Sequence, residues 1–556
     1  MKIQVSELIV RYLERLGVGT IFGMPGAHIL PVYDSLYDST IDSVLVKHEQ
    51  GAAFMACGYA RASGRIGACI TTAGPGATNL VTGIANAYAD HQPVIVITGE
   101  APTYIFGRGG LQESTGEGGS IDQSAIFSGI TRYHKIVERA DYLANVLNQA
   151  SKVLLSDNPG PVLLSFPYNV QQEMVDPAIL DSIVTQKRSA AARDNDPLLD
   201  TMVQYITESD RPVIVSGYGC IKSGAQQQVA RLSESFNIPV TSSLKGKGSI
   251  DEGSALSLGS LGVTSSGYAY EYIVNHADLV IVLGASFNER TSYLWNDRLM
   301  ADKRVVQVDI NEEQLEKVYR ADLCIHADIS EVLGGVLRRL NGHDHLAKTP
   351  QDIAAYKHAI ETRARRERSA ILQDGFSLVR DFFTRLGSHF ADGITVFDDN
   401  IIFAQNLFSV SAGNRYYPNS GVSSLGHAIP AAIGAQFHAR GTMFALIGDG
   451  GFQMCCMELM TAVNYGIPLN VVLFNNATMG LIRKTQSQQY RQRFIDCDFI
   501  NPDYAALACS FGINHRRIET ASDLDALFAD TDFANAINLI EIIVDRNAFP
   551  NYSSRR

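Results

Sequence analysis

Two short polar groups, Gly448-Asp449-Gly450 and Asn475-Asn476, bracket an apolar segment that runs from residue 451 to residue 474. A carboxylate, an amide oxygen and a nearby backbone carbonyl are hard oxygen ligands. Such ligands suit Mg²⁺, which takes its remaining ligands from phosphate and water. Glycine at 448 and 450 lets the backbone approach a phosphate closely. The spacing therefore predicts a site for Mg²⁺ and a phosphorylated ligand.

These polar groups need elements that bring them together. The segments "TMFALIGD" and "LNVVLFNN" each indicate a strand that ends at the polar group, with room between them for one helix and one return strand. Ligands of doubly wound sheets bind at the carboxyl ends of parallel strands, so Asp449 and Asn476 are expected to lie close together. The GDG turn alone is more often an ordinary tight turn before a helix. The helix, the strand and the Asn pair at this spacing favour the metal site.

Strand-like segments alternate with helical patterns along most of the chain, which indicates βαβ units and parallel sheets. We expect an α/β fold of three doubly wound domains at residues 1–175, 190–342 and 370–545, with a linker from Thr185 to Asp200. Strands are expected in "TIFGMPGAH", "SVLVKHEQ", "GACITTAGPGATN", "PVIVITGE" and "PVLLSFPYNV" of the first domain, in "RPVIVSGYGCIKSG", "IPVTSS", "DLVIVLGASF" and "RVVQVDI" of the second, and in "GITVFDD", "TMFALIGD", "LNVVLFNN" and "NLIEIIV" of the third.

Composition excludes several classes of function. The formal charge is −12, from 46 basic and 58 acidic residues, and no Lys/Arg block suggests a nucleic-acid partner. No run of 18 apolar residues suggests a membrane span. The first residues form an amphipathic helical pattern rather than a signal peptide, so a cytoplasmic location is the default expectation. The eight cysteines lack metal-binding spacing and are expected to be reduced thiols.

Longer motifs carry a resemblance to a known family. The GDG and NN groups resemble the diphosphate-Mg²⁺ motif of thiamine diphosphate (ThDP) enzymes. The segments "KHEQGAAFMACGYARASGRIG", "TTAGPGATNLVTGIANAYADHQPVIVITG", "SSLGHAIPAAIGA" and "NPDYAALACSFG" are similar to segments of the acetolactate synthase (acetohydroxyacid synthase) group. The resemblance implies a pyrimidine-binding, a central and a diphosphate-binding domain. It also implies a homodimer or homotetramer with active sites between subunits.

The resemblance also implies roles for individual residues. The metal ligands would be Asp449, Asn476 and the backbone carbonyl of Thr478. Further cofactor-binding residues would be Gly26, Pro75, Asn79, Asn400, Ser423, Leu425, Gly448, Gly450, Gly451, Met479 and Gly480.

Three residues would take part in catalysis. Glu49 would bond the aminopyrimidine N1′ and stabilise the imino tautomer that removes the C2 proton. Leu425 would hold the cofactor in its bent shape, which places the reacting atoms against each other. Gln112 lies near the reacting carbonyl and would donate to a developing oxyanion.

Four features depart from the family pattern. "DDNIIFAQ" replaces a Gly-Gln-His run, so Asn400 or backbone amides would have to contact the diphosphate. Ser286 replaces an arginine implicated in holding a keto-acid acceptor, and Thr485 replaces a tryptophan of the acceptor pocket. The glycine-rich "STGEGGS", which follows Glu113, resembles an insertion and predicts a flexible loop beside the active site.

The implied activity is decarboxylation of a 2-oxo acid, pyruvate in the first place, with transfer of the hydroxyalkyl carbanion to a carbonyl acceptor. A keto acid and an aldehyde both remain open as acceptors. One alternative is a decarboxylase that releases an aldehyde, and another is a non-catalytic nucleotide-binding homologue. The central domain holds either FAD, as in relatives, or an adenine nucleotide, or it is a vestigial domain without ligand, because its GxG turn alone is weak evidence.

Overall fold

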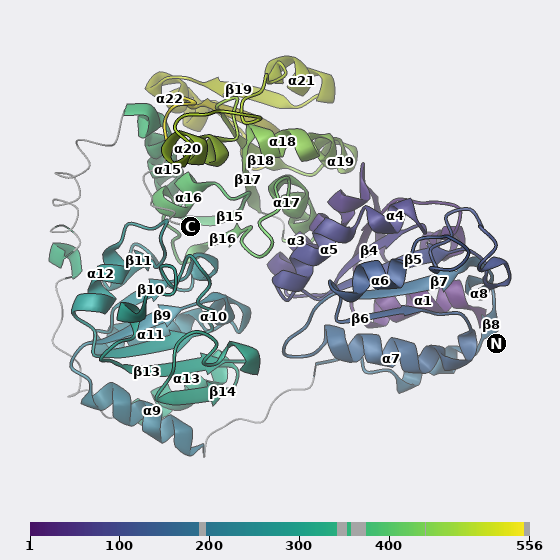
Figure 1. Ribbon diagram of the computed structural model, residues 1–556, viewed down its shortest axis with the longest axis horizontal. Coiled ribbons are helices and arrows are strands. Elements are labelled where there is room, and N and C mark those ends of the chain that lie inside the picture. The colour runs from purple at the N-terminus through teal and green to yellow at the C-terminus, as the bar shows by residue number, and fades with distance from the viewer. Residues whose placement is uncertain (188–195, 342–352, 357, 359–373, 440, 550–556) are drawn as a thin grey trace.

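The computed structural model describes residues 1–187, 196–341, 353–356, 358, 374–439 and 441–549. Within them the chain forms three six-stranded sheets, and every strand pair in these sheets is parallel (Figure 1). This confirms the expected fold of three α/β domains. The expected domain boundaries at residues 190, 342 and 370 lie outside the described residues.

The predicted strands occupy the four central positions of each sheet, and the predicted strand at "SVLVKHEQ" lies at one end of the first sheet. In the first domain the order is β3 (Asp42–Leu45), β2 (Thr20–Gly23), β4 (Gly67–Thr71), β5 (Val94–Glu100), β7 (Val162–Pro167) and β6 (Tyr133–Ile136). In the central domain it is β11 (Ser257–Ser260), β10 (Val240–Ser242), β9 (Pro212–Ser216), β12 (Leu279–Leu283), β13 (Arg304–Asp309) and β14 (Leu323–His326). In the third domain it is β16 (Gly413–Pro418), β15 (Asp392–Asp398), β17 (Thr442–Gly448), β18 (Leu469–Asn475), β20 (Ile537–Ile543) and β19 (Asn514–Ile518). Strands β1 (Ile3–Gln4) and β8 (Met174–Val175) form a separate antiparallel pair.

Helices cover the sheets. The first domain contains α1 (Val5–Arg15), α2 (Leu30–Tyr37), α3 (Glu49–Ser63), α4 (Pro75–Thr78), α5 (Val81–Ala89), α6 (Gln123–Ser128), α7 (Leu143–Leu154) and α8 (Tyr168–Gln171). The central domain contains α9 (Pro197–Glu208), α10 (Tyr218–Lys222), α11 (Gln226–Phe236), α12 (Tyr268–Asn275) and α13 (Ile329–Leu340). The third contains α15 (Ser377–His389), α16 (Ile402–Leu407), α17 (Ala428–Gln436), α18 (Asp449–Cys455), α19 (Leu459–Tyr465), α20 (Gly480–Gln489), α21 (Tyr504–Phe511) and α22 (Ala521–Asp530). Among the described residues, no helix combines the length and the apolar character that a membrane crossing requires.

Two local expectations are corrected. The segment between the GDG turn and the Asn pair holds two helices, α18 and α19, because a short 3-10 turn at Cys456–Glu458 interrupts the helical path. The linker expected to reach Asp200 ends earlier, since α9 begins at Pro197. The Asp196 side chain accepts a hydrogen bond from the Leu198 amide and caps that helix.

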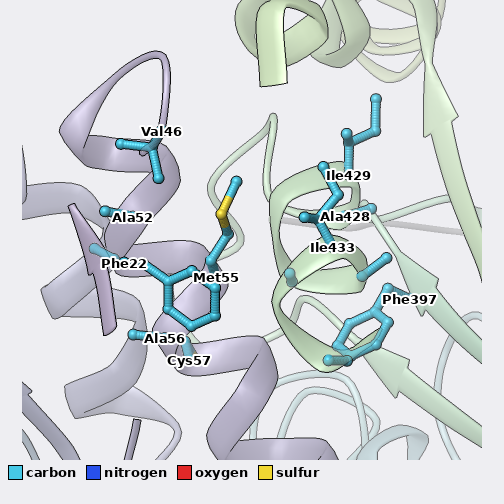
Figure 2. Packing of buried hydrophobic residues seen from close by; sticks show 14 of the residues in the cluster. Phe22, Val46, Ala52, Met55, Ala56, Cys57, Phe397, Ala428, Ile429 and Ile433 are labelled. Atoms are coloured by element: carbon cyan, nitrogen blue, oxygen red, sulfur yellow. The ribbon is translucent and has the colours of Figure 1, made fainter. Parts of the chain in front are cut away.

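The largest apolar cluster joins the first domain to the third. It contains Met55 and Ala56 of α3 and Ala428, Ile429 and Ile433 of α17, all of them buried (Figure 2). The backbones of the two helices approach so closely that only glycine fits at the crossing. A Cβ atom on Gly58 would overlap the carbonyl oxygen of Ala431, and one on Gly434 would overlap that of Met55. The contact therefore requires glycine at both positions.

Replacing Gly58 by alanine is expected to lower the free energy of unfolding by about 1–3 kcal/mol, because a rigid backbone carbonyl must move to admit one methyl group. Gly387, inside α15, provides a matched control. Its added Cβ would meet no atom within 4 Å, so the Gly387→Ala variant should gain about 0.5–1 kcal/mol from helix propensity. Denaturant unfolding of both variants measures the difference. Equal effects at the two sites would contradict the close crossing.

His427 lies at the start of the same contact with both ring nitrogens buried and without hydrogen-bond partners among the described residues. It packs edge-on against Phe54, with ring centroids 5.2 Å apart. Burial lowers the pKa of His427 from 6.5 to about 3. The unfolded chain therefore takes up a proton below pH 6.5 that the folded chain does not, so this residue makes the fold less stable as the pH falls from 6.5.

The variant His427→Phe keeps the ring and removes the titrating group. Its melting temperature should exceed that of the wild type, and the gap should widen between pH 7.5 and pH 5 by the equivalent of about 2 kcal/mol. Comparing the two proteins at each pH cancels the contribution of every other titrating group. A gap that is constant with pH would show that His427 titrates normally in the folded protein.

Candidate cofactor site

Glu49 is the first residue of α3 and is buried. A carboxylate at this position interacts favourably with the positive end of the helix. Its Oε2 accepts a hydrogen bond of 2.9 Å from Asn79 Nδ2, at the end of α4. Oε1 accepts no hydrogen bond from the described residues, so one carboxylate oxygen of a buried acid remains available to a ligand.

Gln112 lies in the loop after β5 with a positive φ of 56°. Its Oε1 is 3.3 Å from His28 Nδ1 and 3.2 Å from Thr72 Oγ1. Gly26 packs on Thr72, where a Cβ atom would come within 2.6 Å of Thr72 Cβ. These contacts join the loops that follow β2, β4 and β5 at the carboxyl ends of the strands of the first sheet.

Pro75 starts α4 at this same edge and is exposed, as is Asn79. The residue before it, Gly74, has a φ of 62°, and a Cβ atom there would approach Gln112 to 3.2 Å. The loop predicted as an insertion follows Gln112. It is closed by a bridge between Thr115 and Asp122, and the preceding Glu113 carboxylate accepts hydrogen bonds from the amides of Gly107 and Gly110.

Asp449 begins α18 directly after β17, and Asn476 follows β18, its parallel neighbour. The Asp449 Oδ2 accepts hydrogen bonds from the amides of Asn476 at 3.0 Å and Ala477 at 2.6 Å. Thr478 is buried, and its amide donates to Asn476 Oδ1 at 3.2 Å. The three expected metal ligands thus lie on two adjoining loops.

Burial raises the pKa of Asp449 above its usual range, and a bound cation would offset that cost. Among the described residues, no group of three His, Cys, Asp or Glu side chains could hold a metal ion. A metal here would be held by one carboxylate together with amide and carbonyl oxygens, the ligand set that Mg²⁺ accepts.

Glycines shape the same loops. A Cβ atom on Gly450 would lie 2.7 Å from Met479 Sδ, and one on Gly480 would lie 3.0 Å from Asn476 Nδ2. A Cβ atom on Gly448 would meet only Ile401 Cδ1, at 3.9 Å. Protein atoms therefore fill the space beside Gly450 and Gly480, whereas the space beside Gly448 is open and a phosphate can approach there.

Asn400, Ser423 and Leu425 come from two further loops of the third domain. Asn400 has a φ of 71° and accepts a hydrogen bond of 3.3 Å from Arg290 of the central domain. Ser423 has a φ of 59°, and Leu425 is half-buried two residues later. Left-handed conformations of non-glycine residues are strained and gather at functional sites.

Two residues without a role in the sequence-based assignment belong to this site. Asn501 Nδ2 donates to Asp449 Oδ2 and to Asn475 Oδ1, both at 2.8 Å. Asp399 accepts hydrogen bonds from the loop that carries Leu425. The segments "NPDYAALACSFG" and "DDNIIFAQ" drew attention to both regions, but the chain distance to their partners hides these contacts in the sequence.

The site residues form two separate groups. Glu49, Gln112, Gly26, Pro75 and Asn79 surround the edge of the first sheet, and the others surround the edge of the third. No hydrogen bond between described residues joins Glu49 or Gln112 to Asp449, Asn476 or Thr478. The Glu458 side chain connects the two domains nearby, where its Oε1 accepts hydrogen bonds from the amides of Lys47 and His48.

Comparison with known proteins matches all three domains. Residues 3–126 match the thiamine pyrophosphate enzyme N-terminal TPP binding domain, residues 199–336 the thiamine pyrophosphate enzyme central domain, and residues 400–540 the thiamine pyrophosphate enzyme C-terminal TPP binding domain. Thiamine pyrophosphate (TPP) and thiamine diphosphate are two names for one cofactor. The three matches follow the order of the three sheets.

Curated relatives extend over nearly the whole chain. A probable acetolactate synthase large subunit of Methanocaldococcus jannaschii is 32% identical, over 97% of this chain and 92% of that protein. An acetolactate synthase of Arthrospira platensis is 33% identical over 91% and 88% of the two chains. The acetolactate synthase isozyme 2 large subunit of Escherichia coli is 29% identical over 98% and 96%. With these matches and the geometry above, the chain belongs to the thiamine pyrophosphate enzyme family, in the acetolactate synthase group.

Proposed function

We propose that this protein is a ThDP- and Mg²⁺-dependent carboligase. It decarboxylates a 2-oxo acid, pyruvate in the first place, and joins the remaining fragment to a carbonyl acceptor. The observation that carries the proposal is the meeting of Asp449 with the Asn476–Thr478 loop at the ends of adjacent parallel strands. The relatives named acetolactate synthase support the reaction type.

The third domain supports binding of a diphosphate with its metal. Asp449 Oδ2 is used by backbone amides and Asn501, whereas Oδ1 has only the adjacent Gly450 amide. Oδ1 is therefore the oxygen proposed for Mg²⁺, with Asn476 Oδ1 and the Thr478 carbonyl completing the protein ligands. The open face at Gly448 admits phosphate oxygens. Met479 and Gly480 follow on the same loop.

The first domain supports proton transfer. When bound, ThDP supplies a carbanion that adds to the 2-oxo group and accepts electrons as carbon dioxide leaves. Glu49 Oε1 is placed to share a proton with the aminopyrimidine, while Asn79 holds Oε2. Gln112 is proposed to orient the substrate carbonyl through its amide nitrogen, because its oxygen already faces His28 and Thr72.

The two separate groups of residues support an assembly of copies. Glu49 and Asp449 each face a sheet edge, and neither group alone contains both the proton-transfer residue and the metal ligands. We therefore infer a homodimer or homotetramer in which the first domain of one copy completes the third domain of another. Two large apolar side chains, Met454 on α18 and Met457 just after it, are exposed and available for such a contact.

The test is to incubate the pure protein with ThDP, Mg²⁺ and pyruvate and to identify products by proton NMR. Loss of pyruvate with formation of acetolactate is the expected result, and it would show that a keto acid is accepted although Ser286 replaces an arginine. Acetaldehyde as the sole product would contradict carboligation and would identify the protein as a simple decarboxylase. Pyruvate consumption that is independent of ThDP would contradict the proposal.

The variant Glu49→Gln controls this experiment. It should reduce turnover by about 100-fold or more, because an amide cannot exchange the proton, while ThDP and Mg²⁺ still bind. Exposed Glu7, which pairs with Arg11 on α1, gives a matched Glu→Gln change of the same charge that should leave the rate unaltered. Full activity of the Glu49→Gln protein would remove Glu49 from the mechanism.

The central domain supports a nucleotide site. A cavity of about 1000 Å³ opens at the carboxyl ends of its strands and is lined there by Tyr218, Asp309 and Asp328. Arg65 of the first domain and Lys222 also line it. Burial lowers the pKa of Lys222 to about 8, a cost that a phosphate group would offset. The aspartates can accept hydrogen bonds from ribose hydroxyls, so the residues fit the adenine nucleotide half of FAD.

Flavin content tests this assignment directly. The purified protein should absorb near 450 nm and release one FAD per chain on denaturation. The double variant Asp309→Asn with Lys222→Met should lose most of the flavin and keep its fold by circular dichroism. ADP or ATP in the released fraction would replace FAD by another adenine nucleotide. A protein that neither carries nor binds a nucleotide would leave the vestigial domain as the correct interpretation.

A further inference from the structure

The loop from Val422 to Gly426 holds Leu425 in an unusual backbone path. Ser423 has a φ of 59° and Gly426 a φ of 81°, so two of its five residues are left-handed. A serine in this conformation is strained and persists only where neighbouring contacts fix it. Leu425 stands between these two residues, so the same contacts determine where its side chain lies.

Asp399 supplies those contacts. It is buried, and its two carboxylate oxygens accept three backbone hydrogen bonds. Oδ2 binds the Gly426 amide at 2.8 Å, and Oδ1 binds the amides of His427 at 2.8 Å and Ala428 at 3.2 Å. These amides precede or open α17, where backbone donors have no partner inside the helix. One carboxylate therefore fixes both the end of the loop and the start of the helix.

The oxygen that accepts from Gly426, Oδ2, also faces the diphosphate turn. A Cβ atom on Gly451 would lie 2.5 Å from Asp399 Oδ2, so the carboxylate occupies the space that a side chain at 451 would need. Asn400, the next residue, belongs to the expected cofactor contacts, and the Asp399 amide donates to Leu446 of β17 at 2.9 Å. The side chain thus lies where three cofactor-binding segments approach one another.

We propose that Asp399 is the positioning residue that sets Leu425 against the bound cofactor. It touches neither substrate nor cofactor and acts through the Gly426–Ala428 amides. The role of Leu425 rests on the proposed function. The way in which Asp399 holds the loop does not depend on it. A two-part experiment separates the two statements.

The first part measures how the loop is held, without any ligand. Asp399→Leu removes the acceptors at similar volume, and Asp399→Asn keeps one acceptor oxygen. Amide hydrogen exchange followed by mass spectrometry should show about tenfold faster exchange of the Gly426–Ala428 amides in Asp399→Leu and an intermediate effect in Asp399→Asn. The control Tyr416→Phe loses a 2.6 Å hydrogen bond to the adjacent Asp398 and should leave these amides protected. Unchanged protection in Asp399→Leu would overturn the proposal.

The second part measures the consequence for the cofactor. With ThDP and Mg²⁺ bound, exchange of the cofactor C2 proton into deuterium oxide is followed by quenched-flow proton NMR. A misplaced Leu425 should slow this exchange by about 100-fold in Asp399→Leu, while the dissociation constant for ThDP changes far less. A general loss of structure would instead weaken ThDP binding and lower the melting temperature.

Each outcome decides one statement. Exchange within twofold of the wild type in Asp399→Leu with ThDP bound would show that Asp399 does not position Leu425. A wild-type protein that binds no ThDP would contradict the proposed function, and the amide exchange would still decide whether Asp399 holds the loop. If Asp399→Leu does not fold, Asp399→Asn carries both measurements, with a smaller effect expected in the same direction.

Discussion

The close crossing of α3 and α17 is the contact on which the geometry of both half-sites depends. Each helix presents a glycine to a carbonyl of the other, so the helix axes approach more closely than side chains would permit. Helix α3 begins with Glu49, and α17 follows Leu425 after two residues. The crossing therefore fixes how Glu49, proposed for proton transfer, stands relative to the loops of the third domain proposed to hold the cofactor. Buried apolar side chains around it make the two domains one packed unit.

The central strands of each sheet could be predicted from the sequence, and the strands that were not predicted lie at sheet edges. Strands β6, β11, β14, β16 and β19 are all terminal in their sheets. An interior strand is buried on both faces and forms a continuous apolar run, as in β5, whereas β19 has the sequence "NHRRI" and is largely exposed. The order of strands follows from no local pattern, because neighbours in a sheet are often distant in the chain.

The candidate site shows the same limit. Asp449 and Asn476 follow neighbouring parallel strands. Their proximity could be predicted because the carboxyl ends of neighbouring parallel strands lie side by side. Asn501 lies 52 residues from its partner Asp449, and Asp399 lies 27 residues from its partner Gly426. The role of each depends on which N–H group donates to which carboxylate oxygen in the folded chain. Side-chain direction in a loop depends on tertiary packing. Ser423 and Asn400, with positive φ, are positions where local preference and the final structure disagree, as is common at functional sites.

The cavity beside Tyr218 is lined by segments from all three domains, including Arg65 of the first, Asp309 of the central and Tyr416 of the third. Nearby, buried Asp90 forms ion pairs with Arg61 of α3 and Lys245 of the central domain. A ligand in such a cavity binds only while the three domains are docked. Binding of such a ligand therefore raises the free energy of unfolding of the whole chain. The increase grows with the logarithm of the ratio of ligand concentration to dissociation constant. If the proposed nucleotide binds in this cavity, its supply in the cell becomes a determinant of how long the folded enzyme survives.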